Sequence, residues 1–170
     1  IFDTCFRGIP LAWKSKNGLV SNTFFDDKGL GWLRSFGGGL LTTCGMRNAG
    51  PPVDVEDIHY GLHGRISSIP AEKVSINEYW KHDEYYIEVS GQTREANTFG
   101  ENLVNRRKIL FSSENNRIEI YDTIVNEGFC KEQIMLLYHL NWGFPLFCEE
   151  AELIIDPENT IVRDGNATPD

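Results

Sequence analysis

Residues 117–125 have the sequence Arg-Ile-Glu-Ile-Tyr-Asp-Thr-Ile-Val, in which β-branched side chains partly alternate with charged and polar ones. β-branched residues pack well on a pleated surface. In a strand every second side chain points toward the same face of the sheet, so such an alternation predicts one apolar and one polar face. Polar turn sequences flank the stretch, Ser113-Glu114-Asn115-Asn116 before it and Asn126-Glu127-Gly128 after it. The stretch therefore predicts a β-strand that short turns join to its neighbours.

Three further stretches predict strands of the same kind. Tyr85–Gly91 is bounded by charged residues and glycine, Leu103–Phe111 has a basic centre, and Gln133–Asn141 follows the turn after Val125. Strand spacings of roughly 10–15 residues with polar turns between them are typical of antiparallel meanders. Helical periodicity is poor everywhere, and the best candidate, Ala71–Tyr79, is short and fits a strand equally well. We predict a mainly β, antiparallel fold.

Residues 1–66 have a different character because glycines crowd them. The glycines concerned are Gly29, Gly31, Gly37, Gly38, Gly39, Gly45 and Gly50, with Pro51 and Pro52 close behind. Such a density predicts tight turns and close backbone approaches rather than long regular elements. The chain shows no internal repeat and no clean linker, so we expect one β domain over residues 1–170.

The composition is that of a globular protein, with 41% hydrophobic and 12% aromatic residues in a chain of 170. The net charge of −9 argues against nucleic acid or an anionic membrane as partner, because both are bound through an excess of Lys and Arg. No apolar run approaches the roughly 20 residues of a membrane span, and no charged-then-apolar signal segment opens the chain. We therefore expect neither a nucleic-acid nor a membrane partner.

The cysteines are Cys5, Cys44, Cys130 and Cys148, without any C-x-x-C pair. A chain of this size needs no disulfides to be stable, so we interpret them as reduced thiols in a cytoplasmic protein. Cys44 fits a small buried hydrophobe better than a nucleophile, because no neighbour in sequence would lower its pKa. The chain opens with Ile1 directly in strand-like sequence and ends in a polar segment. We expect it to be part of something longer.

Two motifs suggest phosphate or metal binding, but the neighbouring residues argue against both. Gly37-Gly38-Gly39 lacks the Lys-Ser or Lys-Thr and the following helix of a phosphate-binding loop. His59 and His63 have the spacing of zinc ligands on one helical turn, but Gly61 and Gly64 disfavour a helix there. No Glu occupies the H-E-x-x-H position either. We predict no metal site.

The most informative residues are His63, within Gly61–Arg65, and His139, within Leu137–Gly143. Each lies in a stretch that resembles a β-strand, and each has a polar residue two positions on, Arg65 and Asn141. Because strand side chains alternate between faces, we expect each pair to project the same way. An imidazole that titrates near neutral pH beside hydrogen-bonding groups suits proton transfer on a neutral polar substrate. This chemistry indicates a sugar.

Aromatic residues after His139 strengthen this interpretation. Trp142, Phe144 and Phe147 offer the flat apolar surface on which the C–H face of a sugar ring stacks. Arg34 and Arg65 are the candidate guanidinium groups. The alternative for His63 is a structural role, as a buried side chain that donates a hydrogen bond to a carbonyl group.

At these residues the sequence resembles the galactose mutarotase-like, or aldose 1-epimerase, superfamily. Leu62-His63-Gly64 is similar to the motif that supplies its substrate-binding His, and Tyr138-His139-Leu140-Asn141 to the strand that supplies its catalytic acid. Several further motifs together resemble one branch of that superfamily. They are Gly31-Trp32-Leu33-Arg34, Phe36-Gly37-Gly38-Gly39-Leu40, Thr42-Thr43-Cys44-Gly45, Gly61-Leu62-His63-Gly64-Arg65 and Pro70-Ala71-Glu72.

The resemblance implies an antiparallel β-supersandwich, of which this chain would be an incomplete, central portion. It implies an isomerase in which His139 donates a proton to the ring oxygen of a monosaccharide. A Glu beyond Asp170 takes the proton from the anomeric hydroxyl group, the ring opens, and it closes as the other anomer. His63, Arg65, Asn141, Arg34 and Trp142 would bind the sugar. No metal or organic cofactor is required, and the 170-residue chain alone should be inactive.

The sequence departs from the family in two ways and leaves other functions open. The Asn-Arg pair that precedes the H-G motif in classical mutarotases is not evident, and Arg34 or Arg47 takes its place. The catalytic Glu has no counterpart before Asp170. A non-catalytic sugar-binding or sensing protein is the rival interpretation, and an isomerase that acts on a sugar acid or sugar phosphate is a third. The sequence does not name the sugar or the oligomeric state.

Overall fold

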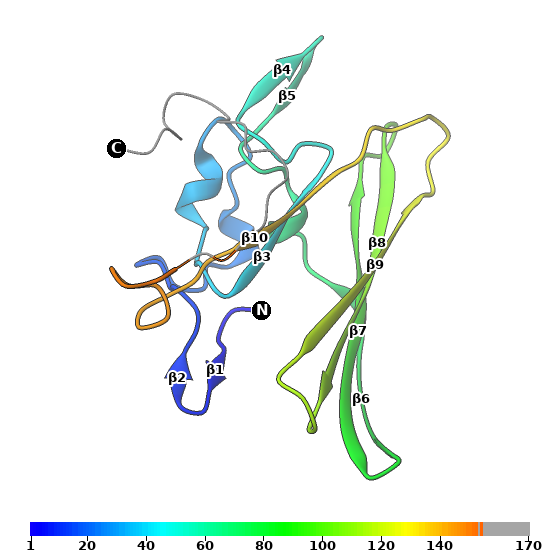
Figure 1. The fold of residues 1–170 in the computed structure, drawn as a ribbon. Coiled ribbons are helices and arrows are strands. Elements are labelled where there is room, and N and C mark those ends of the chain that lie inside the picture. Colours follow the sequence, from blue (N-terminus) through cyan, green and yellow to red (C-terminus); the bar gives the residue numbers. More distant parts are fainter. Residues whose placement is uncertain (153, 155–170) are drawn as a thin grey trace.

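A four-stranded antiparallel meander forms the largest sheet of the computed structural model, which describes residues 1–152 and 154. Its strands are β6 (Glu72–Lys81), β7 (Glu84–Ala96), β8 (Asn102–Ser112) and β9 (Ile118–Asn126), and each pairs with the next along the chain. They form the long curved sheet in green and yellow-green in Figure 1. This confirms the mainly β, antiparallel fold that the sequence predicts.

The remaining strands are shorter and pair in twos. β1 (Cys5–Phe6) pairs with β2 (Ile9–Pro10), β4 (Val53–Val55) with β5 (Ile58–Tyr60), and β3 (Leu41–Met46) with β10 (Met135–Leu140). Three short 3-10 helices, η1 (Asn22–Phe24), η2 (Gly31–Arg34) and η3 (Ile66–Ser68), are the helical segments of the described residues. None of them is long and apolar enough to cross a membrane.

Two of the strands that the sequence predicts can be compared with the strands of the structure. The stretch Ala71–Tyr79, which fits a helix or a strand, is strand β6. The strand expected over Tyr85–Gly91 continues to Ala96, because β7 is paired on both sides and the ladder to β8 carries through Gly91. A glycine that would end an isolated strand is thus held in place by its two neighbours.

The core joins the meander to β3. Met46, Ile66 and Leu103 form one buried cluster, with Ile124 and Leu136 packed against it. Met46 and Leu103 are fully buried, and they come from β3 and β8 respectively. The cluster therefore fixes one face of the meander against the β3–β10 pair, which Figure 1 shows beside it.

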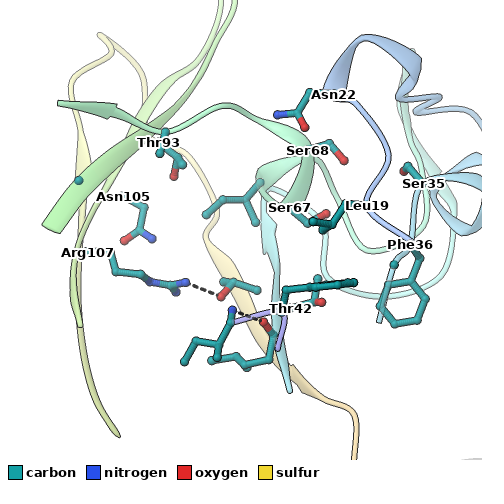
Figure 2. Close-up of a pocket in the computed structure, with 18 of the residues that line it drawn as sticks. Leu19, Asn22, Ser35, Phe36, Thr42, Ser67, Ser68, Thr93, Asn105 and Arg107 are labelled. Atoms are coloured by element: carbon teal, nitrogen blue, oxygen red, sulfur yellow. Dashed lines mark hydrogen bonds between the residues drawn. The ribbon is translucent and has the colours of Figure 1, made fainter. Parts of the chain in front are cut away.

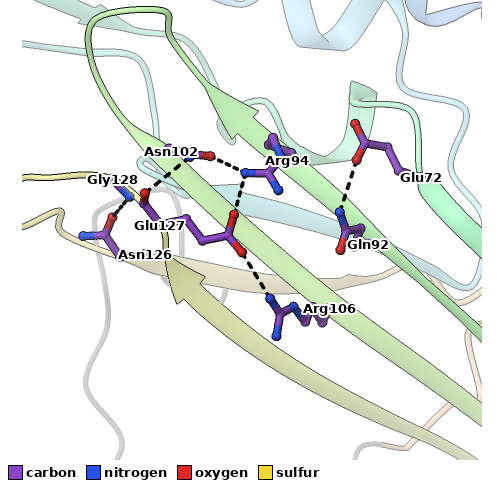
Figure 3. Close-up of polar contacts among 8 residues, drawn as sticks. All are labelled: Glu72, Gln92, Arg94, Asn102, Arg106, Asn126, Glu127 and Gly128. Atoms are coloured by element: carbon purple, nitrogen blue, oxygen red, sulfur yellow. Dashed lines mark hydrogen bonds and ion pairs between the residues drawn. The ribbon is translucent and has the colours of Figure 1, made fainter.

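The other face of β7 and β8 carries mostly polar side chains around the buried Val104. Gln92, Arg94, Asn102 and Arg106 share it through the two-residue period, and Figure 3 shows their contacts. The guanidinium groups of Arg94 and Arg106 both donate to the Glu127 carboxylate, at 2.8 and 3.1 Å. Ion pairs that are this exposed contribute little to stability. The backbone hydrogen bonds between the strands therefore stabilise this part of the sheet more than the ion pairs do.

β6 forms one edge of the meander and is exposed along its whole length. Its large exposed apolar and aromatic side chains are those of Val74, Ile76, Tyr79 and Trp80. An edge strand that carries apolar side chains is a template for pairing with another chain.

Candidate functional site

The two histidines singled out by the sequence lie in contact. The ring centroids of His63 and His139 are 5.4 Å apart, and their planes meet at 76°. His139 lies on β10, opposite Thr42 of β3, and His63 lies between β5 and η3. Segments 76 residues apart in sequence thus place two imidazoles within reach of a single small molecule.

Trp32 and Phe36 form an aromatic wall against this imidazole pair. Their rings stack with centroids 4.2 Å apart, and Trp32 meets the His63 ring edge-on at 4.7 Å. The Phe36 ring lies 5.5 Å from the His139 ring. Trp32 is only 3% exposed, and its indole Nε1 donates to the Ser67 hydroxyl group at 2.9 Å. The aromatic wall therefore has a fixed orientation.

The expectation that His63 lies in a strand is wrong. Its φ is +59° and that of Gly64 is +68°, so the chain turns at this point instead of extending. The period-two rule does not apply across such a turn, and His63 and Arg65 have different partners. Gly64 allows the turn, because a Cβ there would lie 2.2 Å from the Asn48 carbonyl oxygen and 2.4 Å from that of Gly45.

The His63 ring is anchored through one nitrogen. Its Nδ1 lies 2.8 Å from the carbonyl oxygen of Ala49, and a carbonyl can only accept, so Nδ1 carries the proton. The backbone of His63 is also fixed, since its N–H donates to Gly50 and its carbonyl accepts from Gly45. This is the structural role that the sequence left open for His63, and it leaves Nε2 as the ring nitrogen that can contact a ligand.

Asn48 holds the loop that carries this anchor. Its side chain is 5% exposed, and its amide donates to the carbonyl groups of Gly61 and Pro51 at 2.8 and 3.1 Å. Its side-chain oxygen accepts from the N–H of Gly50 at 3.3 Å. The two chain segments on either side of the β4–β5 hairpin are thereby tied together beneath His63.

His139 has the strand position that the sequence predicts. Its Nδ1 is buried and has no hydrogen-bond partner among the described residues. An unpaired buried acceptor costs less than an unpaired N–H, so we assign the proton of the neutral ring to Nε2. Asn141 does not contact this ring. Its amide donates to the backbone carbonyl groups of Gly39 and His139 at 2.8 and 3.2 Å, which ties β10 to the glycine turn.

The structure describes no contact of Arg65, Arg34 or Trp142 with the two imidazoles. Arg65 is half exposed and lies 3.7 Å from the Asp27 carboxylate. Arg34 is exposed at the end of η2, and the structure describes no polar contact of its side chain. Trp142 is 45% exposed and forms a backbone bridge with Ala12. Trp32 and Phe36 occupy the place beside the imidazoles that we expected for Trp142. The sugar-binding roles of Arg65, Arg34 and Trp142 stay predictions.

The remaining sequence candidates have structural partners. Arg47 pairs with Glu101 and Glu132, at 3.2 and 3.1 Å. His59 lies 2.6 Å from Asp54 and accepts from the N–H of Gly29, so both ring nitrogens are used within the fold. In the part of the chain that the structure describes, no three His, Cys, Asp or Glu side chains are grouped as for a metal ion.

Cys44 is fully buried on β3. Burial raises the pKa of its thiol to about 12, because the thiolate would lose its hydration. A thiol of this kind is not a nucleophile at neutral pH, in agreement with its interpretation as a small buried hydrophobe.

Glu95 is a buried carboxyl group that the sequence did not single out. It is 5% exposed, and its Oε2 has no partner among the described residues. It lines a cavity of about 230 Å³ together with Arg47, Arg65 and Glu101. Burial raises its pKa to about 7, although the charge of Arg65 opposes this. Its place in a regular β-strand gave no signal in the sequence.

Glu95 should make stability pH-dependent. Between its ordinary pKa of 4.5 and about 7 the folded protein keeps this proton while the unfolded chain releases it. The free energy of unfolding should therefore fall by roughly 3 kcal/mol across this range, at about 1.4 kcal/mol per pKa unit. Glu95→Gln stays neutral and should lose this drop, as urea unfolding at pH 4.5 and pH 8 would show. The exposed Glu114→Gln is the control, and an equal pH dependence in both variants would refute the assignment.

The comparisons with known proteins agree with this fold. The sequence model of a family described as a domain of unknown function (DUF4432) matches residues 1–170. The crystal structure of a putative aldose 1-epimerase from Klebsiella pneumoniae subsp. pneumoniae is similar, with a TM-score of 0.77 and 24% sequence identity. The match covers 85% of this chain and 38% of that one, so the chain spans well under half of its length. Among curated proteins no sequence matches significantly.

Proposed function

The chain belongs to the DUF4432 family, and from this premise we propose that it carries the acid side of a sugar site in an aldose 1-epimerase-like isomerase. The observation that carries the proposal is the contact between His63 and His139. The similarity to the Klebsiella structure supports it at the level of the fold. The substrate would be a monosaccharide or a sugar derivative.

The two imidazoles suit different tasks in this reaction. In its doubly protonated form, His139 would donate the Nε2 proton to the ring oxygen of the sugar as a general acid, and it would remain as a neutral imidazole. His63 is held by the Ala49 carbonyl through Nδ1, so its Nε2 would accept a hydrogen bond from a sugar hydroxyl group. The anchored ring of His63 is preorganised for binding, and this leaves proton transfer to His139.

The aromatic wall supports the choice of a sugar. Trp32 and Phe36 flank both imidazoles, and they give the pair an apolar boundary. The C–H face of a sugar ring suits such a boundary, while its hydroxyl groups suit the imidazole nitrogens. The base that completes the reaction is expected from a Glu beyond Asp170, as the resemblance implies.

A non-catalytic sugar-binding protein is the second candidate. An isomerase that acts on a sugar acid or a sugar phosphate is a further variant, for which the half-exposed guanidinium group of Arg65 would supply a positive charge. The two classes differ in one observable property, because only an isomerase accelerates the exchange of anomers.

Titration of the intact protein with aldoses, uronates and sugar phosphates tests the proposal. His63→Ala should weaken the binding of the preferred sugar by roughly 10-fold to 100-fold, since a hydrogen bond to a buried polar group is lost. The control is His59→Ala, which removes a histidine of the β4–β5 hairpin and should leave binding unchanged. If no sugar binds at millimolar concentration, or if both variants bind like the wild type, the site is wrongly assigned.

A further inference from the structure

A second cavity of the structure is larger than the one that Glu95 lines. It has a volume of about 470 Å³ and lies between the inner face of β7 and β8 and the segments that carry η2, β3 and η3 (Figure 2). Small-molecule sites typically enclose about 300–1,000 Å³. Neither His63 nor His139 lines it, although Trp32 and Phe36 do.

Two buried polar atoms in its wall have no partner among the described residues. They are Oγ1 of Thr93 and Oδ1 of Asn105, which are direct cross-strand neighbours on β7 and β8. Both side chains line the cavity, and Figure 2 shows them next to each other. A buried polar group without a partner costs about 1–3 kcal/mol, so two adjacent ones indicate a ligand that satisfies both.

The orientation of the Asn105 amide is fixed by a second contact. Asn105 is 3% exposed, and its Nδ2 donates to Oδ1 of Asp122 at 3.2 Å. The oxygen of the amide is therefore the atom left for a ligand, and it can only accept. The Thr93 hydroxyl group can donate or accept. The pair thus matches two neighbouring hydroxyl groups, one that donates to Asn105 and one that accepts from Thr93.

The one charged side chain that lines this cavity, Arg107, is already neutralised. Arg107 donates to both carboxylate oxygens of Asp122, at 2.8 and 2.7 Å, and to the Thr43 hydroxyl group at 2.7 Å. Burial alone would raise the pKa of Asp122, but the hydrogen bonds from Arg107 and Tyr138 outweigh it and keep the pKa low. The charges of Arg107 and Asp122 cancel. The amino group of Ile1 also lines the cavity, but burial and the charge of Arg107 lower its pKa, which disfavours its charged form. The cavity therefore favours a neutral ligand over an anion.

The rest of the wall is largely apolar. It includes Trp32, Phe36, Val89 and Ile109, with Leu19 at the side that Figure 2 shows opposite Asn105. A polar pair facing an aromatic and aliphatic wall is complementary to a ring molecule with hydroxyl groups on its edge and C–H groups on its faces.

We propose that this cavity is a second binding site, for a neutral polyhydroxylated ring molecule such as a cyclitol or an uncharged monosaccharide. Adjacent hydroxyl groups of the ligand pair with Asn105 Oδ1 and Thr93 Oγ1. The proposal goes beyond the function given above, and it does not depend on proton transfer by His139.

Calorimetric titration of the intact protein with myo-inositol tests the proposal, because this ring has no anomeric carbon and cannot be a substrate of the isomerase. Thr93→Val keeps the shape of the side chain and removes its hydroxyl group, and it should weaken binding roughly tenfold. Thr93→Ser restores the hydroxyl group and should restore affinity. Thr123→Val, at an exposed position of β9, is the matched control and should change nothing.

A cavity that holds only water would give a different result in each of these measurements. If the cavity holds only water, myo-inositol will not bind, and Thr93→Val will leave the protein equally stable or more stable, because an unsatisfied hydroxyl group has gone. Equal affinities of the wild type and Thr93→Val would also overturn the proposal. His139→Asn separates it from the proposed function, since this variant should lose anomer exchange and bind myo-inositol with unchanged affinity.

Discussion

Replacement of His139 by Asn is expected to lower the kcat of anomer interconversion roughly 100-fold or more in the intact protein. General acid catalysis typically contributes about 10²–10⁴-fold, and Asn keeps a polar side chain on β10 without a titratable proton. KM should change little, because the acid acts in the transition state more than in the bound state. Polarimetry with freshly dissolved α-anomers would give both constants.

His59→Asn is the control for this variant, because His59 pairs with Asp54 on the β4–β5 hairpin and has no contact with the imidazole pair. It should keep the wild-type rate. A His139→Asn protein with a wild-type kcat would show that another group donates the proton, and a large rise in KM alone would show that His139 only binds.

Gly64→Ala is expected to destabilise the protein by about 3 kcal/mol or more. Its φ of +68° strains any residue with a Cβ, and that Cβ would lie 2.2 Å from the Asn48 carbonyl oxygen. Both obstacles are backbone atoms, at Asn48 and Gly45, so no side-chain rotation can relieve the contact. Urea unfolding would measure the loss, and sugar binding should weaken with it because the turn also positions His63.

Gly18→Ala separates the two contributions. Gly18 has a similar φ of +62°, but a Cβ there would meet nothing within 4 Å. The variant should therefore lose only about 1 kcal/mol, the cost of the left-handed backbone. Equal losses at Gly18 and Gly64 would mean that the close packing of the loop below His63 is not as described.

The regular strands could be predicted from the sequence because their signal is local. Residues 117–125 alternate over a single strand, and β9 covers nearly the same positions. Ala71–Tyr79 was ambiguous because helix and strand patterns overlap in a stretch of only nine residues, and the pairing of β6 with β7 decides it.

The site was predicted only in part, because it depends on long-range contacts. His139 could be placed from the period of its strand, but the turn at His63 could not, since its φ of +59° is set by the loop that Asn48 holds. Trp32 and Phe36 were visible only as parts of motifs, and their contact with the imidazoles arises from the fold. Glu95 gave no signal, because its burial comes from what packs on β7.

The most direct test of the central claim is an imidazole-detected NMR titration of the intact protein with its sugar, with anomer exchange followed in the same sample. The chain has four histidines, so each ring signal can be assigned by single substitution. We predict that the sugar shifts the signals of His63 and His139 and leaves those of His59 and His82 in place, while the anomers exchange faster than they do without protein. Shifts confined to His59 or His82, or exchange at the spontaneous rate, would contradict it.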